Sequence, residues 1–289
     1  MVITDSTEPD PSVDCANSVG RMSIPSSHRI LILAPAFERS VKAGGPARSL
    51  TNLVNAVLDD FRIDVDTPDR DLGDVEPFSG LSGKTERFGS TTVYYLDLRS
   101  LSQVLSLVKR LSANRYEFIL LNSVWDQRLA LPPGILKLLG VFKGPLILMP
   151  RGELEPGALG LKPRRKKIAG PVYRGIYRRA VSLWGATSED EAENIRSWLG
   201  TEARVVTTRN NGSDSIPWGS PEAQSEYLRV LFLSRIHPKK GLLSLLYGLE
   251  HTTRQIALTI AGPVADSDYW QRCQNAIERL PPVESPIVV

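Results

Sequence analysis

The stretch Leu231-Phe232-Leu233-Ser234-Arg235-Ile236-His237-Pro238-Lys239-Lys240-Gly241 joins an apolar run to a basic turn that ends in glycine. Residues 230–233 predict a buried strand, and residues 242–247 predict an amphipathic helix on the other side of the turn. Cations at the carboxyl end of a strand, beside the N-terminus of a helix, favour an anionic ligand such as phosphate. Open α/β sheets bind ligands at this end of their strands. The alternative is a solvated basic turn that only connects the strand to the helix.

The rest of the chain repeats this alternation of short apolar runs and helical patterns. The predicted strands are 29–34, 61–65, 92–96, 118–121, 146–149, 205–207 and 256–261. The predicted helices are 47–58, 101–111, 163–179, 189–199 and 268–280, with Ser188 and Glu191 forming a capping box before the fourth. Residues 67–90 and 212–226 predict a long loop and a linker. The alternation predicts an α/β fold with parallel sheets covered on both faces.

Length and composition predict about two domains in a chain of 289 residues. We expect a disordered acidic tail over 1–27, an N-terminal domain over 28–200 and a C-terminal domain over 201–289. Cys15 and Cys273 lie far apart, which argues against a disulfide framework and for a reducing compartment. The sequence holds no apolar run of about 20 residues, so we expect no membrane-spanning helix.

Residues 162–179 form a basic tract without a single acidic residue. Its cations are Lys162, Arg164, Arg165, Lys166, Lys167, Arg174, Arg178 and Arg179. Such a tract suggests an anionic partner, either phospholipid headgroups or a phosphorylated acceptor. A solvated helix face is the alternative. No nucleic-acid-binding module is recognisable, so we do not expect a nucleic acid as partner.

Five segments, taken in order along the chain, resemble glycosyltransferase family 4, whose members have the GT-B fold. They are Gly44-Gly45-Pro46-Ala47-Arg48-Ser49, the Pro150-Arg151-Gly152 segment with Glu153, residues 186–195, Asn211-Gly212 and the opening stretch. The second and third segments are typical of members that build bacterial surface polysaccharides. The resemblance covers most of residues 28–289.

This resemblance implies two Rossmann-like domains with parallel sheets facing a cleft, the second of them incomplete. It implies a metal-independent, retaining hexosyltransferase without a cofactor, which takes a nucleotide sugar as donor. The implied acceptor is a glycan or a lipid-linked sugar in surface polysaccharide biosynthesis. We expect a cytoplasmic bacterial enzyme with a peripheral contact to anionic lipid at the inner face of the cell membrane.

The resemblance also assigns roles to individual residues. Arg235 and Lys240 grip the donor diphosphate and stabilise it as it leaves, while Gly44 and Gly45 offer backbone N–H groups. The residues assigned to the acceptor side are Asn122, Arg151 and Glu153. Many members carry a histidine where this chain has Asn122, and an amide can orient a hydroxyl but cannot act as a base.

Two features depart from the family pattern or imitate another one. The chain ends at Val289, before the pair of glutamates that holds the sugar and ribose in the family, so a truncated, non-catalytic remnant that binds glycan or membrane is the alternative function. Asp64-Val65-Asp66 imitates an Asp-x-Asp metal motif, because both carboxylates share one face of a predicted strand. We interpret it as a polar strand edge and expect no metal site.

Overall fold

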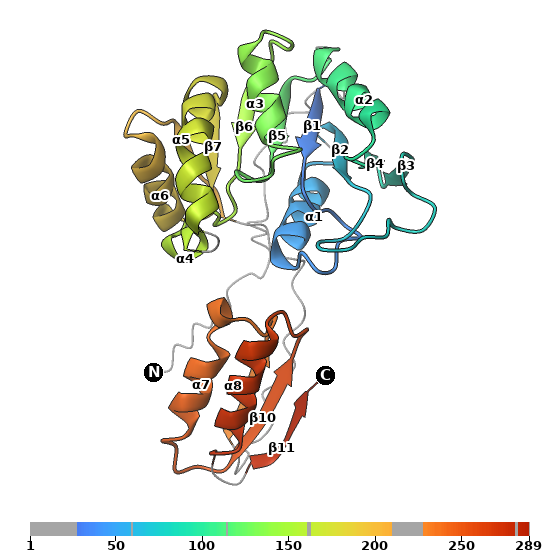
Figure 1. The fold of residues 1–289 in the computed structure, drawn as a ribbon. Coiled ribbons are helices and arrows are strands. Elements are labelled where there is room, and N and C mark those ends of the chain that lie inside the picture. The colour runs from blue at the N-terminus through green and yellow to red at the C-terminus, as the bar shows by residue number, and fades with distance from the viewer. Residues whose placement is uncertain are drawn as a thin grey trace, which may run out of the picture. The chain divides into compact units, whose positions relative to one another are not determined.

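The computed structural model describes residues 28–58, 60–113, 115–160, 163–209, 228–280 and 283–288, with the backbone alone for 163–165 and 283–288. The predicted tail 1–27, the linker 212–226 and the Asn211-Gly212 turn lie outside these ranges. The chain divides into two compact units, one up to Asp214 and one from Ser215. Figure 1 shows the first unit in blue to yellow and the second in orange to red.

The first unit is a mostly parallel sheet with helices on both faces, as the alternation predicted. Its strands, within the described residues, are ordered β3-β4-β2-β1-β5-β6-β7-β8, and only β3 runs antiparallel. The strand bounds are β1 Arg29–Leu33, β2 Arg62–Pro68, β3 Thr85–Phe88, β4 Thr91–Leu96, β5 Phe118–Leu121, β6 Leu146–Leu148, β7 Leu183–Ala186 and β8 Val205–Thr207. The helix bounds are α1 Gly45–Val57, α2 Leu101–Ser112, α3 Leu131–Leu138, α4 Pro156–Leu159, α5 Pro163–Ala180 and α6 Glu189–Leu199.

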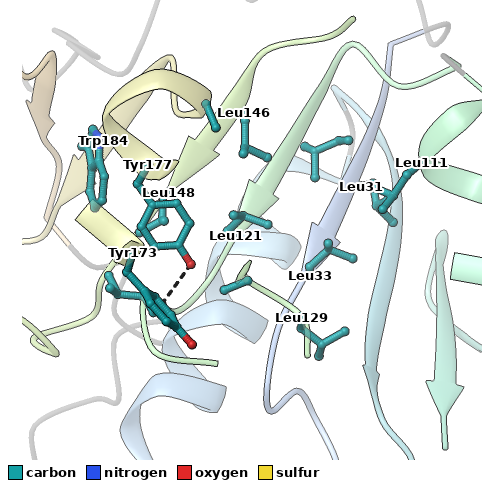
Figure 2. Packing of buried hydrophobic residues seen from close by; sticks show 14 of the residues in the cluster. Leu31, Leu33, Leu111, Leu121, Leu129, Leu146, Leu148, Tyr173, Tyr177 and Trp184 are labelled. Atoms are coloured by element: carbon teal, nitrogen blue, oxygen red, sulfur yellow. Dashed lines mark hydrogen bonds between the residues drawn. The ribbon is translucent and has the colours of Figure 1, made fainter. Parts of the chain in front are cut away.

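Two hydrophobic clusters fix these helices to the two faces of the sheet. On one face, Leu50 and Val54 of α1 pack with Ile32 and Val65 of the strands. On the other face, α2, α5 and α6 cover the remaining apolar side chains. Figure 2 shows this second cluster, in which leucines of β1, β5 and β6 line up beside Tyr173, Tyr177 and Trp184. The central strands β1, β2 and β5 therefore bury both of their faces, which accounts for the unbroken apolar runs of β1 and β5 in the sequence.

The strand order reverses between β1 and β5. Strand β1 pairs with β2 on one side and with β5 on the other, so the following connections leave in opposite directions. A crevice forms outside the carboxyl ends of two such strands, and ligands of doubly wound sheets bind there. The residues after Leu33 and Leu121 are consequently the first place to look for a site.

The second unit is a smaller parallel sheet with two helices on one face. Its order is β11-β10-β9 within the described residues. The bounds are β9 Leu228–Leu233, the 3-10 turn η1 Pro238–Lys240, α7 Leu242–Leu249, β10 Ile256–Ala261, α8 Ser267–Ile277 and β11 Val283–Val288. Leu242 and Leu246 of α7 and Tyr269 of α8 pack on Ile256 and Leu258 of β10. Both helices therefore belong to the core of this unit.

Several elements differ from those predicted. The first unit ends after Asp214 rather than after residue 200, because β8 pairs with β7 and extends the first sheet. The predicted loop 67–90 contains the edge strand β3, whose polar sequence lacks an apolar alternation. Helix α3 was not predicted, because its first turn holds two prolines followed by glycine. No helix within the described ranges has the length and apolar character that crossing a membrane requires.

Candidate functional site

The loop after β1 (residues 35–44, here the glycine loop) brings the chain to the start of α1. Gly44 has φ 63° and ψ −127°, a backbone conformation that only glycine adopts readily, and it forms the N-cap of α1. No side chain caps this end of the helix. A Cβ added at Gly45 would meet nothing within 4 Å, so the space before the first turn of α1 is open. The free N–H groups of this turn can donate to an oxygen-rich ligand.

Three contacts hold the glycine loop in place. The carboxylate of Asp71, in the loop after β2, accepts from the backbone N–H of Lys42 at 3.0 Å. The ammonium of Lys42 pairs with Asp74. Arg39 binds Glu86 of β3 through two nitrogens, and its Nε lies 2.9 Å from Glu86 Oε2. The loop is thus tied to its neighbours at two points before Gly44, which gives it a defined conformation.

Arg151 lies at the carboxyl edge of the sheet. It follows β6 and has φ 54°, the one positive value at a non-glycine residue among those described. Its Nε donates to Asn122 Oδ1 at 2.7 Å and its Nη1 donates to Ser49 Oγ at 3.0 Å. Burial lowers the pKa of Arg151, against the attraction of Glu191. One side chain therefore joins the ends of β5 and β6 to the first turns of α1, and strained backbone at such a point is typical of functional sites.

The carboxylate of Glu153 accepts hydrogen bonds from the loop after β5. Its carboxylate accepts from Ser123 Oγ at 3.0 Å and from the backbone N–H groups of Val124 at 2.5 Å and Trp125 at 3.3 Å. Burial raises the pKa of Glu153, while these hydrogen bonds lower it. The carboxylate is directed into the backbone of the loop. Its structural effect is to position the segment that begins with Asn122.

Glu191 positions the segment after β6 in the same way, through hydrogen bonds to its carboxylate. It is buried, and Ser188 caps its helix by accepting from the Glu191 N–H at 3.1 Å, as predicted. The Glu191 carboxylate does not complete the predicted capping box, because it is bonded to Thr187 and Gly152 instead. Its carboxylate accepts from Gly152 N at 2.6 Å, from Thr187 N at 2.7 Å and from Thr187 Oγ1 at 2.7 Å. The bond to Gly152 links α6 to the residue that follows Arg151, so Glu191 supports the strained turn.

The predicted residues of the first unit thus fall into two groups. Asn122 and Arg151 are bonded to each other at the crevice, and Gly44 starts the helix that carries Ser49. Glu153 forms the second group, because it is bonded to Ser123 and Val124 in the loop after β5. Sequence reasoning missed Ser49, although the serine closes the quoted glycine segment, and it assigned Glu191 only a capping role.

In the second unit, Arg235 and Lys240 lie on the connection between β9 and α7, as predicted. His237 Nδ1 accepts from Lys239 N at 3.2 Å and caps η1, and Gly241 at φ 72° turns the chain into α7. Arg235 is half-buried and Lys240 is exposed, and neither forms a salt bridge within the part of the chain that the structure describes.

The turn after β9 is held against the turn after β10. A Cβ at Gly262 would lie 2.1 Å from Ser234 O, and Ile236 N donates to Pro263 O at 2.9 Å. Only glycine permits this approach at residue 262. The backbone that carries Arg235 is therefore fixed by a neighbouring strand end, while its guanidinium remains available to a ligand.

Asp64 and Asp66 share one face of β2, as predicted, but this face is buried under α2. Asp64 Oδ2 accepts from Tyr116 at 2.8 Å and from Arg29 at 3.2 Å, and Asp66 Oδ2 accepts from Arg110 at 3.0 Å. Among the described residues, no group of three or more His, Cys, Asp or Glu side chains is suited to a metal ion. These aspartates form ion pairs inside the fold on a central strand, which differs from the polar strand edge that we expected.

Asp66 should give the protein an unusual stability profile with pH. Burial raises its pKa to about 6, because desolvation outweighs the attraction of Arg110. The folded carboxyl group then holds its proton more tightly than the unfolded one, so its stabilising contribution is complete below about pH 4 and is lost as the pH rises through 6. The loss is on the order of 3 kcal/mol. In urea unfolding between pH 4 and 7.5, Asp66→Asn should remove this slope.

The exposed substitution Asp268→Asn is the control for this experiment and should leave the profile unchanged. The groups that face Asp66 are Arg110, Arg115 and Asp64, and all three stay in place in both variants. Parallel profiles for wild type and Asp66→Asn would contradict the assignment.

The fold resembles that of several solved glycosyltransferases. Anabaena HepE in complex with UDP and glucose matches with a TM-score of 0.63 and 20% identity, over 91% of this chain and 69% of that chain. The galactosyltransferase WaaB of the lipopolysaccharide outer core matches with a TM-score of 0.55 and 16% identity, over 90% and 67%. Trehalose-6-phosphate synthase from Burkholderia multivorans gives 0.52 and 15%, over 87% and 68%.

These neighbours are GT-B glycosyltransferases, and the chain shares their fold, as the sequence predicted. A comparison with protein-family models and with the sequences of curated proteins found no match. This likeness concerns the fold, and a shared fold by itself assigns no function.

Proposed function

We propose that this chain is a retaining glycosyltransferase of family 4, which transfers a sugar from a nucleotide sugar to a glycan or lipid-linked acceptor in bacterial surface polysaccharide biosynthesis. The observation that carries the proposal is the pair Arg235 and Lys240, which flanks the turn between the parallel strand β9 and the N-terminus of α7. The predicted burial of β9 holds for one face only, because Leu231 and Leu233 are exposed. Neighbours of the same fold were solved with UDP and with UDP-glucose. Two cations beside a helix N-terminus suit the diphosphate of such a donor.

In this proposal the second unit stabilises the departing diphosphate. The planar guanidinium of Arg235 supplies two parallel donors to phosphate oxygens, and the ammonium of Lys240 adds a compact charge. Negative charge grows on the leaving group as the bond to the sugar breaks, so fixed cations lower the barrier without a metal ion.

The first unit positions the acceptor. Arg151 donates a hydrogen bond to the side-chain carbonyl oxygen of Asn122. The amide N–H₂ of Asn122 can then donate to a sugar hydroxyl. An amide cannot remove a proton, and in a same-face reaction the departing phosphate itself accepts the proton of the acceptor hydroxyl. Retention of the anomeric configuration therefore agrees with the absence of a histidine at residue 122.

Calorimetric titration of the full chain with UDP tests the proposal. We expect binding that weakens as ionic strength rises, because screening reduces the attraction between phosphate and cation. Transfer from UDP-glucose and other UDP-sugars to a bacterial lipid extract would then identify donor and acceptor. A chain that binds no nucleoside diphosphate would contradict the proposal and favour the non-catalytic alternative.

We further propose that α5 contacts an anionic membrane from the cytoplasmic side. Ile168 and Val172 lie one helical turn apart and are 79% and 59% exposed. Lys167 and Arg174 are exposed on the adjoining face of α5, where they and Arg178 line a groove of about 410 Å³. Exposed apolar side chains surrounded by cations suit the boundary between lipid headgroups and acyl chains.

Binding to vesicles that contain phosphatidylserine should weaken steeply with salt. Each basic residue near such a surface contributes about 1 kcal/mol, so Arg174→Ala with Arg178→Ala should lower the partition coefficient by roughly 30-fold. The control Arg254→Ala with Arg279→Ala changes the net charge equally on exposed residues of the second unit. Equal losses in both double variants, or binding that does not respond to salt, would refute a contact through α5.

A further inference from the structure

A cavity of about 500 Å³ lies in the first unit between the glycine loop and α1. One wall is Glu38 and Ser40 of the loop, and the other is formed by the first three turns of α1. Phe88, the last residue of β3, also lines the cavity. The volume falls within the range of pockets that hold small-molecule ligands. Helix α1 and strand β3 are labelled in Figure 1.

The polar groups of this cavity suit a ligand rich in hydroxyls. Glu38 offers acceptors, Arg48 offers donors, and the amides of Asn52 and Asn55 offer both. A sugar hydroxyl donates and accepts at once, so neighbouring hydroxyls are matched by this mixture. The negative charge of Glu38 offsets the positive charge of Arg48, so the cavity does not favour a purely anionic ligand. Phe88 adds an apolar surface on which the C–H groups of a pyranose ring can pack.

Contacts within the protein hold several of the residues that line the cavity. The ring of Phe88 packs against Phe37 with centroids 5.8 Å apart and an interplanar angle of 82°. Thr51 Oγ1 donates to Ala47 O at 3.1 Å within α1, so that hydroxyl is already used. Asp71 holds the loop through Lys42 N. Preformed walls reduce the entropy that binding costs.

Gly44 lines this cavity and also begins the helix that carries Ser49 to Arg151. We infer that the cavity binds a sugar residue of the acceptor. Sugar recognition follows from the cavity itself, whereas the role of that sugar as acceptor rests on the proposed function.

Saturation-transfer NMR of the full chain tests this inference with five probes: glucose, galactose, N-acetylglucosamine, lactose and cellobiose. We expect saturation transfer to at least one of them. Glu38→Ala with Asn55→Ala should weaken that binding at least tenfold, and both side chains are exposed, so the fold should persist. The matched control is Glu193→Ala with Asn275→Ala, which removes the same groups from exposed helical positions elsewhere and should change nothing.

A UDP titration on the same samples separates the two hypotheses. UDP binding without saturation transfer to any sugar would overturn the cavity assignment and leave the proposed function standing. Sugar binding that persists in Glu38→Ala with Asn55→Ala would also overturn it. Sugar binding that this double variant abolishes, in a chain that binds no UDP, would support the cavity and refute the donor site.

Discussion

Replacing Arg235 and Lys240 together by alanine should reduce the affinity for UDP by at least about 100-fold. Hydrogen bonds to charged groups contribute about 1.5–3 kcal/mol each, and a factor of ten in affinity corresponds to about 1.4 kcal/mol. Both side chains lie outside the packed core, so the second unit should keep its stability. Calorimetric titration of wild type and variant measures the effect, and sugar transfer should fall with it.

The control for this experiment is Arg254→Ala with Arg279→Ala. It removes the same charge from the same unit at exposed residues away from the turn after β9, so general electrostatic attraction falls equally. We expect its UDP affinity to stay close to that of wild type. If the two double variants bind UDP alike, the cations of the turn have no specific role and the donor site lies elsewhere.

The single variants distinguish the two cations further. Arg235→Lys keeps the charge but loses the planar fork, so affinity should fall by roughly tenfold. Lys240→Arg keeps both charge and donors, and its effect should be smaller. If Arg235→Lys and Lys240→Arg changed the affinity for UDP equally, the two residues would attract the diphosphate by charge alone.

Much of the fold could be predicted because it depends on local patterns. Residues 118–121, 189–199, 205–207 and 256–261 form the predicted elements with the predicted bounds. Strands buried on both faces carry unbroken apolar runs, and a capped amphipathic helix carries its boundary in its own sequence. The alternation of strands and helices along the chain then favours a parallel sheet.

The pairings of β3 and β8 were missed because they depend on distant partners, and α3 was missed because of its prolines. Strand β3 becomes a strand because Thr85–Phe88 pairs with β4, and its own sequence is polar. Strand β8 was predicted as a strand, but its membership of the first sheet follows from pairing with β7, which no local pattern encodes. Helix α3 forms despite two prolines because they occupy its first turn, where a missing N–H costs little.

In the candidate site, too, the local features could be predicted from the sequence, whereas the contacts between distant residues could not. Asn122 and Arg151 could be selected by their places after predicted strands, because the carboxyl ends of parallel strands share one edge. The bonds that orient them join residues 102 and 29 positions apart, from Arg151 to Ser49 and to Asn122. Such distances in sequence leave no periodic signal. The supporting role of Glu191 was hidden for the same reason, since its partner Gly152 lies 39 residues away.

Glu191→Ala should destabilise the first unit by about 3–5 kcal/mol, a large part of a typical folding free energy. The variant leaves the N–H groups of Gly152 and Thr187 without their acceptor, and each unsatisfied buried donor costs about 1–3 kcal/mol. Loss of the bond to Gly152 also frees the strained turn at Arg151, so activity should fall even where the variant remains folded. Denaturant unfolding and transfer kinetics at low temperature measure the two effects separately.

Two further variants make the test specific. Glu191→Gln keeps one acceptor oxygen but presents N–H₂ to a second donor, so we expect roughly half of the loss. Glu193→Ala removes an exposed carboxylate from the same helix and should change stability by less than about 0.5 kcal/mol. Equal stability of Glu191→Ala and Glu193→Ala would show that the bonds to Gly152 and Thr187 contribute little. The turn that carries Arg151 would then owe its conformation to its own backbone, and α6 would have no part in positioning the site.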